Sequence, residues 1–217
     1  MSSASDRSAE NDPAFGWAAP GGPLPCINEL DPAHAAFASL IDVVRGFQDS
    51  IAGAAPPADV SHAVARQLGG LIELLEPHLV GEQRQLFNRI PAVTGHAQSL
   101  TPTLLIDEAS ADAVRGRVTF TRFHLGGRWA AHGGAIALTF DSLLGRLAVS
   151  GGRPRSRTAY LHVDYRHITP LETELRFAAQ FVREEGRKRY ITGTMHAGDV
   201  LCAEADGLFL ELLPGQP

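Results

Sequence analysis

The sequence predicts an α+β domain that acts as a dimer, with an antiparallel sheet wrapped around one long helix. Between residues 103 and 213, six strand-like segments surround one apolar helix, in the order strand, strand, helix and four strands. Short turns join the last four strands, which predicts an antiparallel meander. Because one helix cannot cover both faces of such a sheet, we expect another partner to cover the remaining face or edge.

The composition fits a soluble domain and excludes several classes of protein. The 217 residues are 44% hydrophobic and 20% charged, and they can hold one sizeable domain plus an extension. The net charge of −5, without a basic arm, argues against nucleic-acid binding. Two cysteines, Cys26 and Cys202, supply neither a disulfide framework nor a zinc site. No signal peptide or membrane-spanning run is visible, so we expect a cytoplasmic location. We expect no metal, because His162 and Asp164 share one face of a strand and His167 points the other way.

The composition also divides the chain into three parts. Residues 1–30 are rich in Ser, Ala, Gly and Pro and predict a disordered or loosely ordered tail. Residues 31–95 predict a helical extension, and residues 96–217 predict the main domain. The apolar faces of the extension must be buried, and the main domain is the expected partner.

Local signals bound the helices of the extension. Asp31 followed by Pro32 is typical of an N-cap and a first helical position, which predicts a helix to about Asp49. A second helix is expected from Ala58 until Pro77 ends or kinks it. A third helical piece is expected over residues 82–89.

The spacing of apolar residues predicts the elements of the main domain: a repeat of two indicates strands, and a repeat of 3.6 indicates a helix. A helix is expected over residues 132–149, because Ile136, Phe140, Leu144 and Leu147 follow helical spacing and Gly151 and Gly152 stop it. Gly126 and Gly127 are expected to close the strand before it. The expected strands cover residues 103–107, 113–123, 158–168, 174–184, 187–196 and 200–213.

The start of this helix carries a candidate site. Gly133 and Gly134 open the helix, and unpaired backbone N–H groups at a helix N-terminus can bind a developing oxyanion. Asp141 lies among apolar residues, where a carboxylate without a partner is costly. Eight residues separate Gly133 from Asp141, which is about 12 Å along a helix. If both act on one carbonyl carbon, the Asp must come from a second copy, as in a two-fold dimer with antiparallel helices.

These motifs together resemble a known family. His132-Gly133-Gly134, Asp141 nine residues after the histidine, and then Gly145 are similar to the helix signature of hotdog-fold acyl-CoA thioesterases of the PaaI type. The thioesterase superfamily member four branch is the most similar. The downstream runs Thr158–Tyr165, Pro170-Leu171 and Glu185–Lys188 add to the resemblance, as does Ala203-Glu204-Ala205, so that it covers about residues 100–213. It implies a hotdog fold and hydrolysis of acyl-CoA thioesters to a carboxylic acid and CoA, without a cofactor beyond the substrate's own coenzyme A.

The resemblance also implies roles for individual residues. The Gly133 N–H would bind the thioester oxygen, and Asp141 of the partner chain would act as a general base on water or attack directly. Thr158 would position water or the carboxylate, and His132 would hold the loop and contact the thioester. Some relatives carry Asn or Gln six residues before the histidine, where this chain has Gly126, so this polar group is absent.

Coenzyme A carries several phosphate charges, which suit arginine. The resemblance implies contacts with the substrate or its CoA group at Gly134 in the helix motif and at Arg157, Arg187, Lys188 and Arg189 in the loops and hairpin. For the basic residues, a solvated basic turn is the alternative.

Other functions stay open at this point. The chain is alternatively a non-catalytic acyl-CoA-binding hotdog dimer or, more remotely, an enoyl-CoA hydratase or dehydratase that uses His132. The dimer could assemble further into a tetramer. The helical extension could form a lid over the acyl pocket.

Overall fold

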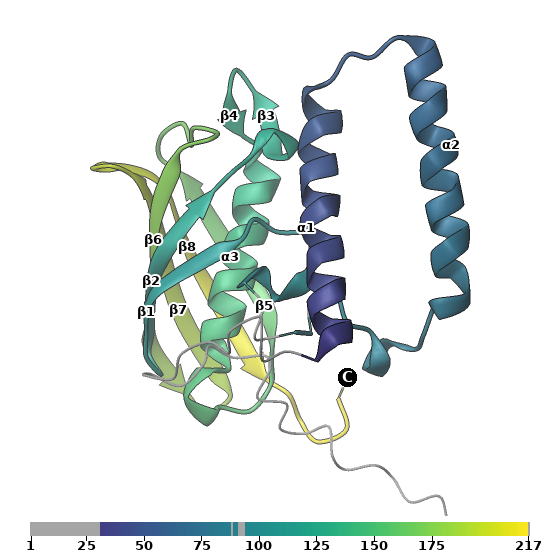
Figure 1. Cartoon of the computed structure of the whole chain (residues 1–217). Helices are drawn as coiled ribbons and strands as arrows, with labels where there is room; N and C mark the ends of the chain where they lie inside the picture. Colours follow the sequence, from purple (N-terminus) through teal and green to yellow (C-terminus); the bar gives the residue numbers. More distant parts are fainter. Residues whose placement is uncertain (1–30, 88, 91–93, 217) are drawn as a thin grey trace, which may run out of the picture.

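The computed structural model describes residues 31–87, 89–90 and 94–216. The tail predicted for residues 1–30 lies outside this range. Within it, a six-stranded sheet curves around helix α3, and a pair of helices stands on the other side of α3 (Figure 1). The helices are α1 (Pro32–Gly53), α2 (Ala58–Leu75) and α3 (Gly133–Ala148). None of the described helices has the length and apolar character needed to cross a membrane.

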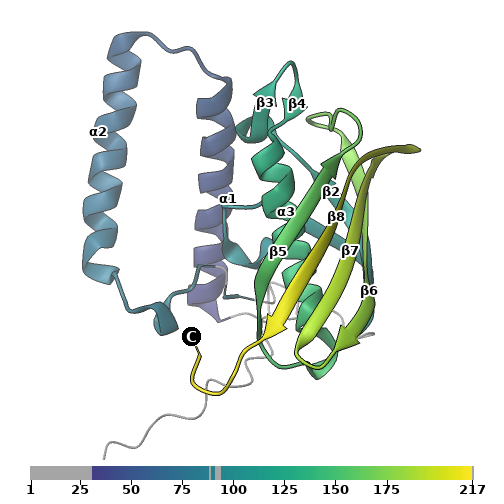
Figure 2. The same cartoon turned by 180° about the vertical axis from the view of Figure 1, so that it is seen from behind.

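The sheet is antiparallel throughout, and its order is β1-β2-β6-β7-β8-β5. The two strands before α3 therefore form one side, and the first strand after α3 crosses to the opposite edge (Figure 2). The strands are β1 (Leu104–Ala109), β2 (Ala113–Thr119), β5 (Ser156–Tyr165), β6 (Glu174–Glu185), β7 (Lys188–Ala197) and β8 (Val200–Glu211). The predicted α+β class with a helix wrapped by the sheet is confirmed.

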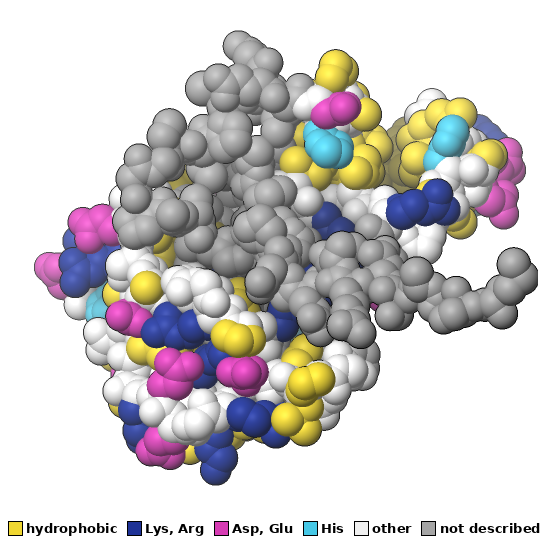
Figure 3. Space-filling view, turned by 90° about the horizontal axis from the view of Figure 1, so that it is seen from below, with side chains coloured by type: hydrophobic (Ala, Val, Ile, Leu, Met, Phe, Trp, Pro, Cys, Tyr) yellow, Lys and Arg dark blue, Asp and Glu magenta, His cyan; other side chains and the backbone are white. Residues whose placement is uncertain are grey.

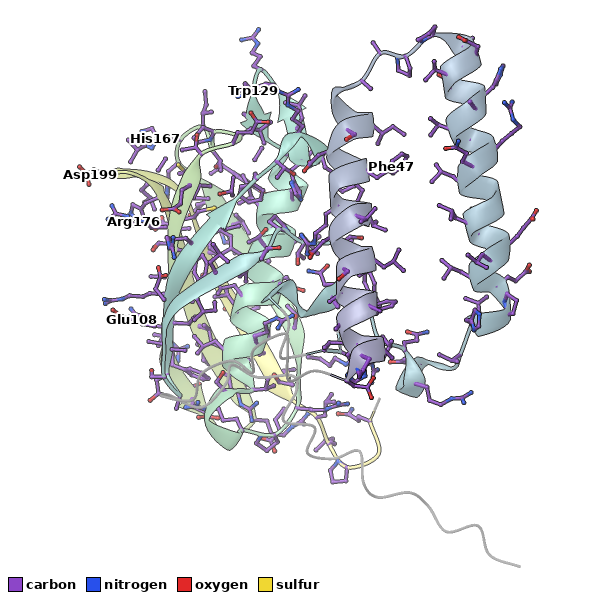
Figure 4. The ribbon with its side chains drawn as sticks, in the orientation of Figure 1. Phe47, Glu108, Trp129, His167, Arg176 and Asp199 are labelled. Atoms are coloured by element: carbon purple, nitrogen blue, oxygen red, sulfur yellow. The ribbon has the colours of Figure 1, made fainter. Side chains whose placement is uncertain are left out.

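The main core lies between α3 and the concave face of the sheet. Phe140, Leu144 and Leu147 of α3 are fully buried against sheet residues such as Phe209. Gly193 of β7 lies directly beneath the helix, because a Cβ built there would be 3.1 Å from Phe140 Cε1 and Leu144 Cδ2. The apolar stripe of α3 thus rests on bare backbone in the middle of the sheet. The opposite face is open, and Glu108 and Arg176 point away from it (Figure 4).

The segment between β2 and α3 differs from the prediction. The strand expected to reach residue 123 ends at Thr119, and a 3₁₀ turn (Arg122–His124) follows. A small hairpin then forms from β3 (Leu125–Gly127) and β4 (Ala130–Ala131). Its turn uses positive φ angles at Arg128 (48°) and Trp129 (61°), which residues other than glycine seldom adopt, so the residue types at these two positions did not predict the turn.

Helix α1 begins as predicted. Asp31 Oδ1 accepts a hydrogen bond from the Ala33 N–H at 2.7 Å, and Pro32 occupies the first turn. The helix runs four residues further than expected, to Gly53. Ala38 and Ile41 are buried against Ile90 and Ala97, and Asp49 Oδ1 accepts a hydrogen bond from the Phe123 N–H at 3.1 Å, so α1 packs on the main domain as expected.

Helix α2 contradicts the expectation that the main domain buries both helices. It has no buried residue, and it stands apart from the sheet domain in both views (Figures 1 and 2). Seen from below, the lower ends of α1 and α2 form two groups, and both carry apolar side chains (Figure 3). The third predicted helical piece is reduced to a 3₁₀ turn at Glu82–Arg84, since so short a segment, preceded by Gly81 without a side-chain cap, cannot sustain an α-helix.

Candidate active site

The first turn of α3 is held by two side chains. His132 is the N-cap residue, and its Nδ1 accepts a hydrogen bond from the Gly134 N–H at 2.9 Å. The Tyr165 hydroxyl donates to the Gly133 carbonyl at 2.9 Å. Both ends of the peptide unit between Gly133 and Gly134 are therefore fixed. Tyr165 was missed as a site residue; it lies in the run Thr158–Tyr165, but its alternation in the strand does not reveal a contact with the helix.

These contacts leave one helix amide for a ligand. The Gly134 N–H is engaged by His132, so this predicted substrate-binding group is occupied. The Gly133 N–H has no acceptor within the described part of the chain. It stands at the positive end of α3, where an oxygen that gains negative charge is stabilised.

Backbone groups of three neighbouring segments contact the turn at His132. The His132 N–H donates to the His124 carbonyl at 2.7 Å, and the Ala131 N–H donates to the Thr169 carbonyl at 2.8 Å. Gly126 lies against this turn, since a Cβ built there would be 2.7 Å from His132 Cα. The missing polar side chain at position 126 thus has a physical reason: the backbone of His132 occupies the space.

Asp141 lies two turns further along α3 and is half-buried. The Thr158 hydroxyl, at the start of β5, donates a hydrogen bond to Asp141 Oδ1 at 2.9 Å. The family resemblance implied that Thr158 positions water or the carboxylate, and the structure brings the two side chains together. Asp141 also lines the cavity described next.

A cavity of about 340 Å³ opens beside Asp141. Its floor is formed by the C-terminal half of α3, with Gly145 and Val149, and its sides by the start of β5 and the end of β8. Phe209 and Leu212 supply apolar surface. Polar and charged residues form most of the remaining lining. This cavity, called the Asp141 cavity below, therefore has one apolar side and several polar sides.

The predicted phosphate contacts fall into three different environments. Arg157 lines the Asp141 cavity. Arg187 lies in the β6–β7 hairpin and donates twice to the Glu211 carbonyl, at 2.9 and 2.7 Å, and Lys188 beside it is exposed. The structure does not bring this hairpin into the described cavity.

Arg189 is wrong as a surface contact for phosphate. Its side chain is 1% exposed and its guanidinium is fully engaged. It donates to the carbonyls of Ala148 (2.9 Å) and Pro154 (2.7 Å) and to the carboxylates of Glu184 (3.0 Å) and Glu211 (2.8 Å). One buried side chain thus ties the end of α3 to three other segments. Alternation with Ile191 and Met195 in the strand was the signal that could have placed it inside.

No family model matches the sequence. The acyl-coenzyme A thioesterases THEM4 of Mus musculus and Rattus norvegicus are each 36% identical over 88 residues, which is 40% of this chain and 37% of each relative. The chain therefore spans little more than a third of the length of these curated relatives.

A solved structure extends the likeness. The crystal structure of a thioesterase superfamily protein matches with a TM-score of 0.69 and 27% identity, over 81% of this chain and 90% of that one. This share exceeds what the sheet and α3 supply, so it includes part of the N-terminal helical region. These findings confirm the predicted fold and relationship: the chain has the hotdog fold and is related to the acyl-CoA thioesterases of the thioesterase superfamily.

Proposed function

We propose that this protein hydrolyses acyl-CoA thioesters to a carboxylic acid and CoA. The observation that carries the proposal is the hydrogen bond of 2.9 Å between Thr158 and the Asp141 carboxylate beside a cavity. Asp141 lies on α3, and the first amide of this helix, at Gly133, has no acceptor among the described residues. Likeness to thioesterases supports the same chemistry.

In the proposed mechanism, the Gly133 N–H binds the thioester oxygen and the positive end of α3 stabilises the charge that develops there. Asp141 takes a proton from a water molecule, and the water oxygen forms a bond to the carbonyl carbon. The C–S bond then breaks, and the CoA thiolate leaves and takes up the proton. Thr158 orients the Asp141 carboxylate through its hydroxyl. Direct attack by Asp141 is the alternative: its oxygen bonds to the carbonyl carbon, the C–S bond breaks to release CoA thiolate, and a mixed anhydride forms. When labelled water then attacks the Asp carbonyl of this anhydride, ¹⁸O enters the Asp141 carboxylate in a single turnover, whereas general-base catalysis places it in the product acid.

One chain cannot complete this site. Gly133 and Asp141 are eight residues apart in one continuous helix, about 12 Å, whereas a reacting carbonyl needs both within about 3 Å. We therefore infer a two-fold homodimer that joins Gly133 of one protomer to Asp141 of its partner. The ten-residue strand β5 supports this arrangement, because it is an edge strand that carries the exposed Tyr160 and Tyr165.

The Asp141→Asn variant tests the mechanism. We expect hydrolysis of a panel of short, medium, long and aromatic acyl-CoAs to fall at least about a hundredfold, with retained folding and CoA binding. Asn keeps the volume and an acceptor for Thr158, so loss of fold does not explain the result. Full turnover by the Asn variant would remove Asp141 from the mechanism, and a monomeric parent protein would remove the shared site.

A second candidate function is acyl-CoA binding without hydrolysis. The observation that favours it is Gly126, where the close backbone of His132 excludes the polar side chain that some relatives carry. Calorimetric binding of CoA esters that stay intact for hours would establish it. In the hydratase alternative, the acid–base work would fall to Nε2 of His132, because its Nδ1 caps α3.

A further inference from the structure

Helix α1 has two apolar faces, and the main domain buries only one of them. Ala38 and Ile41 pack on the domain, whereas Leu40 and Val43 are 40% and 70% exposed. Phe47 lies on the side of α1 that faces α2 (Figure 4). The residues Leu40, Val43 and Phe47 follow one another at intervals of three and four, which is the spacing of a seam between helices in a bundle.

Helix α2 carries a seam of the same kind. Its apolar residues repeat at intervals of four, three and four, and they are Val64, Leu68, Leu71 and Leu75. The helix has no buried residue and no side-chain hydrogen bond at its N-cap, and the pair Gly69-Gly70 costs about 1 kcal/mol of helix stability per glycine relative to Ala. Because most helical stability in proteins comes from packing of an apolar face, α2 requires a packing partner.

The linker between the two helices favours a wide spacing. Residues 54–57 read Ala-Ala-Pro-Pro, and both ends are extended, with φ/ψ of −97°/151° at Ala54 and −65°/164° at Pro57. The prolines restrict the linker to this form. Four extended residues span about 13 Å, whereas the axes of directly packed helices are about 8–10 Å apart and those across the diagonal of a four-helix bundle about 11–14 Å. The linker therefore suits two helices at diagonal corners of a bundle, which leaves two corners for another molecule.

The exposed apolar surface of this hairpin is large enough for a stable interface. Eight large aliphatic residues between Leu40 and Leu75 are 40–70% exposed. Together they expose on the order of 800 Å², which is what one partner contributes to a standard protein interface and more than the apolar patches of a typical monomer.

The charges of the hairpin favour a protein over a lipid surface. Residues 32–79 hold two arginines, no lysine and five carboxylates, a net charge of 2 − 5 = −3. Helices that bind membrane surfaces instead carry Lys and Arg on their polar face. Neither seam contains a charged residue, as in the core of a protein interface. A two-fold axis supplies the complement, because the outer face of α1 then meets α2 of the other copy twice.

We propose that the α1–α2 hairpin packs against the hairpin of a second copy of this chain, so that the four helices form a bundle. The outer face of α1 contacts α2 of the partner, and the two copies together bury on the order of 1,600 Å² of surface, as in a standard interface. This contact goes beyond the proposed function, because it uses no residue of the Asp141 cavity and no step of the reaction.

Cross-linking between isotopically labelled copies tests this contact. The full chain carries Cys26→Ser, Val43→Cys and Leu71→Cys, and the remaining Cys202 is buried. Unlabelled and ¹⁵N-labelled chains are mixed, equilibrated, treated with a short bismaleimide and analysed by mass spectrometry. We expect positions 43 and 71 to be linked between an unlabelled and a labelled chain, because both lie near the middle of their helices. Links within single chains only, or no links, overturn the proposal.

Hydrogen exchange of α2 is an independent test. In the parent, α2 should be protected, and Val43→Glu on the other helix should speed its exchange at least about tenfold, because the bundle would bury an unpaired carboxylate. Exchange of α3 should not change. The matched control is Val182→Glu, since Val182 is 54% exposed and lies on β6, outside the hairpin.

An unprotected α2 in the parent, or an equal effect of Val43→Glu and Val182→Glu, overturns the proposal. Protection of α2 that arises only with phosphatidylcholine vesicles also overturns it and assigns the hairpin to a lipid surface. Neither measurement uses hydrolysis of a thioester, so this inference and the proposed function fail separately.

Discussion

Replacing Arg189 with Met should destabilise the protein far more than it alters binding of CoA esters. Met has a similar length but donates no hydrogen bond. The change leaves the carbonyls of Ala148 and Pro154 without the donors that reach them at 2.9 and 2.7 Å. It also leaves Glu184 and Glu211 without their cation.

The magnitude follows from burial. A buried carbonyl that loses its donor costs about 1–2 kcal/mol. The two glutamates are 39% and 32% exposed, so they regain water and their ion pairs add at most about 1 kcal/mol each. We expect a loss of about 3 kcal/mol in the free energy of unfolding, which is a large part of the stability of an ordinary domain.

Urea unfolding measures this loss. With a slope of about 2 kcal/mol per molar urea, the midpoint should fall by about 1.5 M. Lys188→Met is the matched control: this neighbour is exposed, so its midpoint should move by less than about 0.25 M. If Arg189→Met unfolds at the parent's midpoint while KM for CoA esters rises, the side chain binds phosphate and the reasoning from burial is wrong.

Three further predictions concern the start of α3. Gly126→Asn should lower the melting temperature by several degrees and lower hydrolysis rather than raise it, because its Cβ would lie 2.7 Å from His132 Cα; an Asn variant with parental stability would refute the clash. Tyr165→Phe should lower kcat several-fold in a steady-state thioesterase assay and cost about 1 kcal/mol of stability by urea unfolding, since one hydrogen bond to the Gly133 carbonyl is lost; unchanged kcat would show that this bond does not position the helix start. Burial lowers the pKa of His124, so as the pH falls the unfolded chain takes up the imidazole proton before the folded chain does. The stability that His124 contributes is therefore complete above about pH 6.5 and is lost as the pH falls towards the folded pKa. His124→Asn should flatten this part of a plot of unfolding free energy against pH, and an equally steep plot would assign the dependence to other groups.

The sequence predicts the parts of this fold that depend on local periodicity. Ile136, Phe140 and Leu144 repeat at helical spacing, and the structure places them on the buried face of α3. Asp31 and Pro32 mark the start of α1 because capping is a local interaction. The pairing of Asp141 with Thr158 was expected from family resemblance, and it joins residues 17 positions apart.

Other features depend on contacts that no local pattern encodes. The β3–β4 hairpin turns at Arg128 and Trp129, which are poor turn residues, so only the surrounding structure holds their positive φ angles. The position of Arg89 in the cavity depends on how the chain returns from α2. Composition cannot reveal such a contact, because its partners are separated by at least fifty residues.

The bare backbone beneath α3 has a consequence for the whole site. Helix and sheet approach each other through a missing methyl group at Gly193, and Asp141 directly follows the Phe140 that rests there. A Cβ at position 193 would push the helix away from the sheet by a few tenths of an ångström. This is a sizeable part of the displacement of roughly 0.5 Å that a catalytic arrangement of side chains tolerates. The distance between the Asp141 carboxylate and Thr158 thus depends on the absence of a side chain at Gly193, which contacts the opposite face of the helix.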